Sequence, residues 1–221
     1  MAVLMEQELN VLKKELLTLG AEVEGRVQQA VQALLTGDRK LAQQVRGGDS
    51  QIDNMEIELE EECLKILALH QPVATDLRFI VSVLKINNDL ERVADFAVNI
   101  AERALDLDHV IKVDCPYDIA TMAKVVETML KMALDSLVER NSDLARQTIR
   151  LDDEVDALHK GNFSRVKQAI RDDMNSMDGL INYLSISRYL ERMGDLATNI
   201  AEDIIYQVDG EIIRHGGMQI S

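Results

Sequence analysis

The sequence has few residues that interrupt helices and few that favour β-structure. Its 221 residues include two prolines, no tryptophan, four tyrosines and three phenylalanines. Proline is the strongest helix breaker, so its scarcity permits long helices. The abundant Ala, Leu, Met, Glu and Arg favour them. No segment shows a competing strand pattern, and the sequence therefore predicts an all-α protein.

Cysteine and long apolar runs are scarce as well. Cys63 and Cys115 are the only cysteines, which excludes a disulfide framework and a zinc-finger spacing. Cys63 has apolar neighbours at helical spacing and is predicted to lie in the core. No stretch has the length of a membrane span, and residues 1–9 lack the basic start and apolar run of a signal peptide. We therefore expect a cytoplasmic protein.

Positive charge is in deficit. Lys and Arg number 24 against 39 Asp and Glu, which gives a formal net charge of −15. A surface of this sign repels the phosphate backbone, so nucleic acid is not expected as a partner. It attracts cations and basic protein surfaces, although a charge of this kind also serves solubility alone.

Apolar residues recur at helical spacing in two successive sets of segments. In the first set we expect helices over about residues 6–35, 50–70 and 73–107, with a short helix around residues 41–45. Gly37-Asp38, Gly47-Gly48 and Pro72 mark the breaks, and Asp49 or Ser50 is a plausible N-cap. Beyond a linker at residues 108–116, the second set is expected to contain helices over residues 117–139, 143–151, 152–173 and 178–208.

The two sets are copies of each other. Residues 90–102 match residues 190–202 at nine of thirteen positions with an offset of 100, and earlier in each half the offset is 103. We therefore predict two tandem, pseudo-symmetric three-helix bundles. The first repeat occupies residues 1–110, the second occupies residues 116–209, and residues 210–221 form a C-terminal tail that we expect to fray.

Each half repeats the same acidic pairs at a spacing of four residues. Residues four apart are neighbours on a helix, and like charges there weaken the helix. Four such pairs in matching positions of the two halves therefore suggest that these carboxylates have a functional role. The pairs are Asp49 with Asp53, Glu91 with Asp95, Asp152 with Asp156, and Glu191 with Asp195.

Helical angles place these carboxylates at the edge of the core. At about 100° per residue, Asp95 lies at about 40° from Glu91 and Asn99 at about 80°. Apolar residues occupy the same azimuth earlier in the helix, and the second half repeats the arrangement with Asn199. If the long helices of a half pack side by side, two acidic pairs meet.

Clustered carboxylates cannot all remain ionised without a cation or a proton. Carboxylate and amide oxygens suit hard cations, iron or manganese. The sequence thus predicts one metal site in each half. The alternative is a solvated acidic face in which Arg92 and Arg192 soften the charge.

Two further segments complete a resemblance. One is Leu-His-Gln-Pro-Val-Ala-Thr-Asp-Leu-Arg at residues 69–78, and the other is Gly-Glu-Ile-Ile-Arg-His at residues 210–215. Together with the doubled Leu-Glu-Arg-x-x-Asp-x-Ala-x-Asn-Ile-Ala-Glu segment, they resemble the PhoU family of phosphate-signalling regulators over nearly the whole chain. One departure is that Asp89 in the first half corresponds to Tyr189 in the second.

The resemblance implies a regulator and not an enzyme. Such a protein restrains phosphate uptake and the phosphate-starvation response by linking the ATPase subunit of a phosphate ABC transporter to a phosphate-sensing histidine kinase. These partners would place it at the inner face of the membrane, and we expect a homodimer. The resemblance also implies multinuclear metal clusters at the acidic motifs, with iron expected first and zinc, manganese, magnesium or calcium as alternatives.

Two other functions remain open from the residues. A ferritin-like oxidase would need paired Glu-x-x-His elements. His159 follows Asp156 by three residues but has no counterpart in the first half, so it is expected to be an ordinary interface or surface histidine. A metal-free helical scaffold is the other alternative.

Overall fold

The computed structural model describes residues 2–107 and 113–213, with the side chains of all these residues except Ala2, Val3 and Asp49. In these residues there are only helices and connecting segments, which confirms the all-α prediction. The helices are α1 (Ala2–Thr36), α2 (Arg39–Gly47), α3 (Asp49–His70), α4 (Ala74–Leu107), α5 (Ile119–Glu139), α6 (Ser142–Asp172), the 3-10 helix η1 (Met174–Ser176) and α7 (Met177–Asp209).

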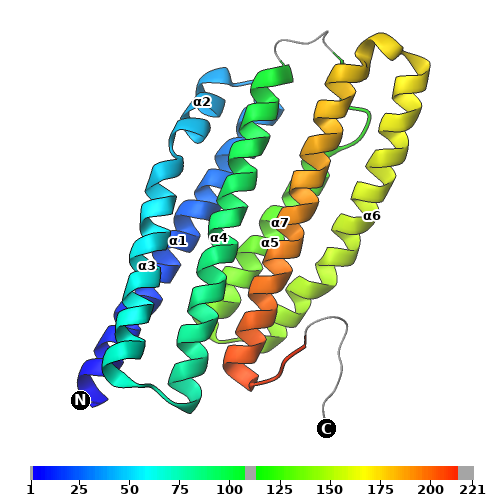
Figure 1. Ribbon diagram of the computed structural model, residues 1–221. Coiled ribbons are helices and arrows are strands. Elements are labelled where there is room, and N and C mark those ends of the chain that lie inside the picture. The colour runs from blue at the N-terminus through cyan, green and yellow to red at the C-terminus, as the bar shows by residue number, and fades with distance from the viewer. Residues whose placement is uncertain (1, 108–112, 214–221) are drawn as a thin grey trace.

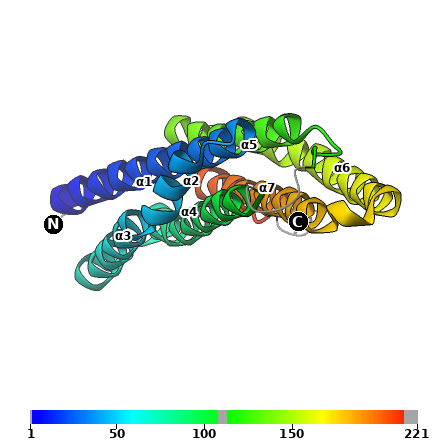
Figure 2. The ribbon, with the colours of Figure 1, turned by 90° about the horizontal axis from the view of Figure 1, so that it is seen from above.

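The helices form two bundles that lie side by side. α1, α3 and α4 pack together in the first half with α2 against α1 and α4, and α5, α6 and α7 pack together in the second. α4 runs antiparallel to α7 at the junction, and α1 contacts α5 (Figure 1). Seen from above, α1 and α5 cover α4 and α7, so one continuous core joins the halves (Figure 2). The predicted pair of bundles is thereby confirmed.

Equivalent side chains begin equivalent helices. The Asp38 carboxylate accepts hydrogen bonds from the backbone N–H groups of Lys40 and Leu41 at the start of α2. Asn141, which is 103 residues later, accepts one from the N–H of Leu144 at the start of α6. Short polar side chains satisfy N–H groups that the first turn of a helix leaves unpaired.

The second half departs from the prediction in one element. Residues 142–172 form the single helix α6, and the expected separation into residues 143–151 and 152–173 was wrong. Arg150 and Leu151 stand where the first half has Gly47 and Gly48. Glycine destabilises a helix by about 1 kcal/mol relative to alanine, whereas arginine and leucine are good helix formers, so the helix continues.

The connections also refine the expected boundaries. α3 begins at Asp49 with Gly48 at the N-cap, so neither Asp49 nor Ser50 has the expected capping position. α3 ends at His70, and Pro72 lies in the connection before α4. Residues 108–112 of the expected linker and residues 214–221 of the expected tail lie outside the described residues. The proposed limits of the repeats remain a prediction.

The core is apolar and follows the predicted helix faces. Cys63 is fully buried as predicted, and burial raises the pKa of its thiol to about 12. Met122 and Met129 are also fully buried. Among the described residues, no helix combines the length and the apolar character that crossing a membrane requires.

Candidate functional site

The second-half carboxylates converge where α6 packs against α7. Asp152 and Asp156 lie one turn apart on α6, and Glu191 and Asp195 lie one turn apart on α7. Asp152, Glu191 and Asp195 are partly buried, whereas Asp156 is exposed. The structure therefore brings the four predicted residues of this half to one seam at the edge of the core.

The four carboxyl groups lie close enough to shift one another's pKa values. Burial, followed by repulsion from Asp195 and Asp156, raises the pKa of Asp152 from 3.8 to about 6. Burial also raises the pKa of Glu191 and Asp195, and other carboxylates of the four add to this rise, while Arg192 opposes it. Repulsion of this kind favours either a bound proton or a bound cation.

Gly194 allows α6 to approach α7 closely at this point. A Cβ atom at Gly194 would lie 3.4 Å from both Asp152 Oδ1 and Val155 Cγ1, which is tighter than most such contacts. The first half has Ala94 at the equivalent position. The glycine therefore lets the backbone of α7 lie directly against the Asp152 carboxyl group.

One carboxylate oxygen of Asp152 is buried without a partner. The Thr198 hydroxyl lies close enough to offset part of the rise that burial causes in the pKa of Asp152. However, neither Asp152 Oδ1 nor Thr198 Oγ1 is aligned for a hydrogen bond with any described residue. Buried polar atoms are usually paired, so an unpaired acceptor at a carboxylate cluster suits the binding of a cation or water.

His159 lies beside this cluster. Its proximity offsets a small part of the rise that burial causes in the pKa of Glu191, and its Nδ1 atom is 2.9 Å from the Ser187 hydroxyl oxygen. Asn162 also donates to that oxygen at 3.1 Å. His159 is thus an interface histidine within a buried polar network, in agreement with the prediction.

Three of the four predicted carboxylates of the first half lie among the described side chains. Asp53 lies on α3, and Glu91 and Asp95 lie on α4, which packs against α3. The side chain of Asp49 lies outside the described residues. Burial, followed by repulsion from Glu60 and Asp53, raises the pKa of Glu56. Glu56, a residue that the sequence analysis did not select, therefore lies close to Asp53 on α3.

Over the described residues, which leave out the Asp49 side chain, no three histidine, cysteine, aspartate or glutamate side chains stand close enough to hold a metal ion as they are placed. The oxygen donors in the second half have the right chemistry for a hard cation. Binding there would require their side chains to rotate toward one another. The metal assignments, including Asn99, therefore remain predictions.

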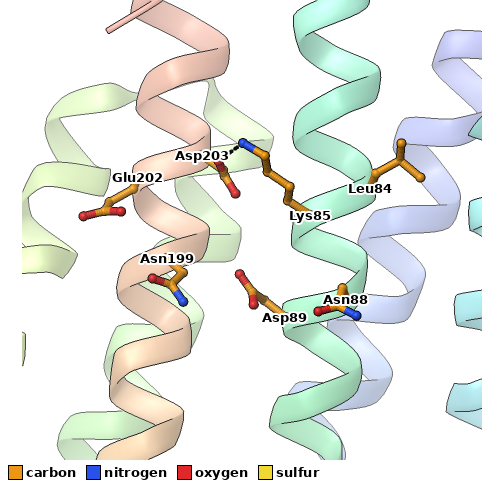
Figure 3. A pocket seen from close by; sticks show the side chains of 7 residues that line it. All are labelled: Leu84, Lys85, Asn88, Asp89, Asn199, Glu202 and Asp203. Carbon is orange, nitrogen blue, oxygen red and sulfur yellow. Dashed lines mark hydrogen bonds and ion pairs between the residues drawn. The ribbon is translucent and has the colours of Figure 1, made fainter. Parts of the chain in front are cut away.

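Asn199 lies in the wall of a separate pocket between α4 and α7. This pocket has a volume of about 570 Å³ and is also lined by Leu84, Lys85, Asn88, Asp89, Glu202 and Asp203 (Figure 3). The Lys85 ammonium group forms an ion pair of 2.9 Å with Asp203, whose side chain is 5% exposed. It also lies 5.5 Å from the centre of the Tyr206 ring.

The sequence analysis missed the pair of Lys85 and Asp203, although the repeat contained a signal. The equivalent positions are Ser185 and Arg103, so both members of the pair depart from the duplication together. Paired departures of opposite charge indicate a contact between the halves that forms at only one of its two pseudo-equivalent positions.

Comparison with known proteins agrees with this architecture. A family model described as the PhoU domain matches residues 16–104 and again residues 119–204. The chain belongs to the PhoU family. The two matches coincide with the two helical bundles, so each bundle is one copy of the PhoU domain.

PhoU relatives match over nearly the full length. A phosphate-specific transport system accessory protein PhoU homolog from Pseudomonas aeruginosa is 39% identical over 212 residues, covering 96% of this chain and 88% of the relative. The corresponding homolog from Clostridium acetobutylicum is 36% identical over 209 residues, covering 94% and 95%.

Solved PhoU structures have the same fold. The crystal structure of PhoU from Pseudomonas aeruginosa aligns with a TM-score of 0.89 at 38% identity, covering 93% of this chain and 99% of that one. The phosphate transport system regulatory protein PhoU from Streptococcus pneumoniae aligns with a TM-score of 0.87 at 27% identity, covering 96% and 100%.

Proposed function

We propose that this protein is a phosphate-transport accessory protein that negatively regulates phosphate uptake and the phosphate-starvation response. The observation that carries the proposal is the match of both bundles to the PhoU domain, together with relatives that are named as accessory proteins of phosphate-specific transport. The role is regulatory and not catalytic. It places the protein in the cytoplasm, beside the membrane through its partners.

The proposed partners are the ATPase subunit of a phosphate ABC transporter and a phosphate-sensing histidine kinase. Long helices with a net charge of −15 offer extended acidic surfaces, and such surfaces attract basic patches on other proteins. In this scheme the protein, as a homodimer, holds the kinase in its silencing mode when phosphate is plentiful.

Gene deletion in the source organism tests the regulatory role. Deletion should derepress phosphate-starvation genes and raise phosphate uptake in phosphate-rich medium, and a plasmid copy should reverse both effects. Unchanged expression and uptake would refute the role.

Affinity purification from phosphate-replete cells, with cells lacking the kinase as the control, should recover the transporter ATPase and the kinase together. Recovery of neither partner would refute the adaptor part.

We also propose that the carboxylate seams bind a hard cation, with the seam of Asp152, Asp156, Glu191 and Asp195 as the better-supported site. The support is the unpaired Oδ1 atom of Asp152, together with the burial and the mutual repulsion that raise the pKa of Asp152, Glu191 and Asp195. Iron and manganese suit such oxygen donors, and zinc, magnesium or calcium are alternatives. A bound cation would relieve the repulsion.

Elemental analysis of the purified protein and titration calorimetry with manganese test this site. Asp152→Asn and Glu191→Ala should lower the metal content or weaken binding by about tenfold or more, because each removes a charged donor. Asp153→Asn is the matched control, since Asp153 is exposed on the same helix. Equal metal content in all three variants would refute the assignment.

A further inference from the structure

Two sequence segments that the carboxylate seams do not use meet at one end of the molecule. Residues 69–78 include the end of α3, its connection to α4 and the start of α4, and Gly210 follows α7. The Arg78 guanidinium carbon lies 4.0 Å from the position that a Cβ atom of Gly210 would occupy. Residues 69–78 and Gly210 therefore lie where α4 begins and α7 ends, at the lower end in Figure 1.

A polar pocket lies at this junction of the two halves. Its volume is about 260 Å³, and it is formed by α1, the start of α4, the residue after α5 and the end of α7. Its lining residues are Glu6, Leu9, Asn10, Lys13, Thr75, Asp76, Phe79, Arg140 and Gln207. Most of these residues are polar, and charges of both signs are present.

The pocket offers positive groups from three elements. Lys13 is held beside the last turn of α5, because its ammonium group donates to the Val138 carbonyl oxygen at 3.4 Å. Arg140 follows α5 and also lines the pocket. Thr75 and Asp76 belong to the first turn of α4, where backbone N–H groups have no intrahelical partner and the helix dipole favours anions.

The same pocket offers acceptors that need a hydrogen-bond donor. Glu6 and Asp76 carry carboxylates. Gln207 is only 7% exposed, and its Oε1 atom is buried with no hydrogen-bond partner among the described residues. Because the Gln207 side chain lines the pocket, rotation of its carboxamide would turn this oxygen toward a ligand. A fully ionised oxyanion would meet repulsion here.

We propose that this pocket binds inorganic phosphate. Near neutral pH, phosphate carries negative oxygens for Lys13, Arg140 and the start of α4, and also at least one P–OH group that can donate to Gln207 or Asp76. Sulfate has the same shape but carries no proton, so the carboxylates disfavour it. The identity of the ligand rests on the proposed function, and binding would make the regulator a direct phosphate sensor.

Binding is tested with the full-length protein, by titration calorimetry and phosphorus NMR with inorganic phosphate at constant ionic strength. Saturable binding is expected, with phosphate preferred over sulfate and over methyl phosphate by about tenfold. Methyl phosphate separates free phosphate from phosphate monoesters, because its dianion has no P–OH group. Failure to saturate, or equal binding of phosphate and sulfate, overturns the proposal.

Substitutions locate the site. Lys13→Gln and Arg140→Asn should each weaken phosphate binding by about fivefold to tenfold. Asparagine suits position 140 because Arg140 has a left-handed backbone with φ of 53°. Lys14→Gln is the control, since it removes the same charge from an exposed neighbour on α1. If neither variant weakens phosphate binding, or if Lys14→Gln weakens it as much as they do, the assignment of the site is overturned.

Two further variants separate ligand contact from folding. Gln207→Leu removes a buried carboxamide oxygen that has no partner, so stability should not fall, yet phosphate binding should weaken several-fold. Asp76→Asn should improve sulfate binding and reduce the preference for phosphate. Unchanged binding by Gln207→Leu and an unchanged preference in Asp76→Asn would together overturn the site. If gene deletion derepresses the starvation response while the purified protein binds no phosphate, the regulatory role stands and direct sensing fails.

Discussion

The two halves differ most clearly where the first half breaks a helix and the second half does not. In the first half, α2 ends at Gly47 and α3 begins at Asp49, whereas α6 runs without interruption from Ser142 to Asp172. Both halves are copies of one domain, so the difference comes from residues that differ between the two copies at this point. It teaches that local sequence decides helix continuity even inside a shared fold.

A single buried position reports the same difference. Arg26 on α1 is 9% exposed, and its guanidinium group donates to the carbonyl oxygens of Val45 at 3.2 Å and Gly48 at 2.9 Å. These carbonyls lie where α2 ends and the helix dipole is negative. The equivalent residue in the second half is Met129, which is fully buried in the core. Arginine is present where a break exposes carbonyls, and methionine where none does.

The largest effect is expected when the second half receives the residue of the first. Met129→Arg places a charge in a core that offers no free helix end, so we expect a loss of about 3–5 kcal/mol in the free energy of unfolding. Urea unfolding followed by circular dichroism measures this change. Met129→Leu, which nearly conserves volume, should lose less than about 1.5 kcal/mol. Similar losses in both variants would show that the pairing of charge and helix break is unimportant.

The reverse substitution should have a smaller effect. Arg26→Met removes two hydrogen bonds from a charged donor and leaves their acceptors at the helix end, which should cost about 2 kcal/mol. The same unfolding measurement applies. Arg46→Met is the control, because Arg46 is an exposed residue of α2. A loss no greater than that of the control would remove Arg26 from the explanation of the break.

The third prediction concerns Asp152 on α6, which corresponds to Asp49 in the first half. The pKa of Asp152 is raised to about 6, so the folded protein holds this proton more tightly than the unfolded chain does. The resulting destabilisation is absent below about pH 3.8, grows up to about pH 6 and is complete above it. The full shift corresponds to about 3 kcal/mol, which solvent screening at this partly exposed site reduces to about 1–2 kcal/mol.

Asp152→Asn should therefore stabilise the protein by about 1–2 kcal/mol at about pH 8 in the presence of a chelator, and the gain should vanish near pH 4. Unfolding midpoints at a series of pH values measure it. Asp153→Asn, on the exposed side of α6, should show a smaller gain. A gain that does not depend on pH would contradict the assignment of the proton to Asp152.

The sequence was sufficient for most of the fold, because apolar spacing sets helix faces and the duplication sets their order. It correctly predicted that Cys63 would be buried in the core. The continuity of α6 was missed, because the repeat transfers the helix break of the first half to residues 150 and 151, where Arg150 and Leu151 replace the two glycines and do not break a helix.

The candidate site was predicted less completely. Carboxylate spacing identified the four groups that meet between α6 and α7, since a spacing of four places side chains on one helix face. The partnership of Lys85 with Asp203 depends on how α4 packs against α7. Periodicity within one helix carries no information on that packing. The junction pocket was missed for the same reason, because it joins residues from both halves.

The smallest expected effect distinguishes the two glycines of the break from each other. A Cβ atom at Gly47 would meet no described atom within 4 Å beyond its chain neighbours and helix backbone. Gly47→Ala should therefore stabilise the protein by about 0.5–1 kcal/mol through higher helix propensity.

A Cβ atom at Gly48 would lie 3.0 Å from the guanidinium nitrogens of Arg26. Gly48→Ala should displace that group from its carbonyls and lower stability by about 1 kcal/mol. Unfolding midpoints compare the two variants. Opposite signs would show that the break depends on contact with Arg26, whereas equal gains would show that it depends on glycine flexibility alone.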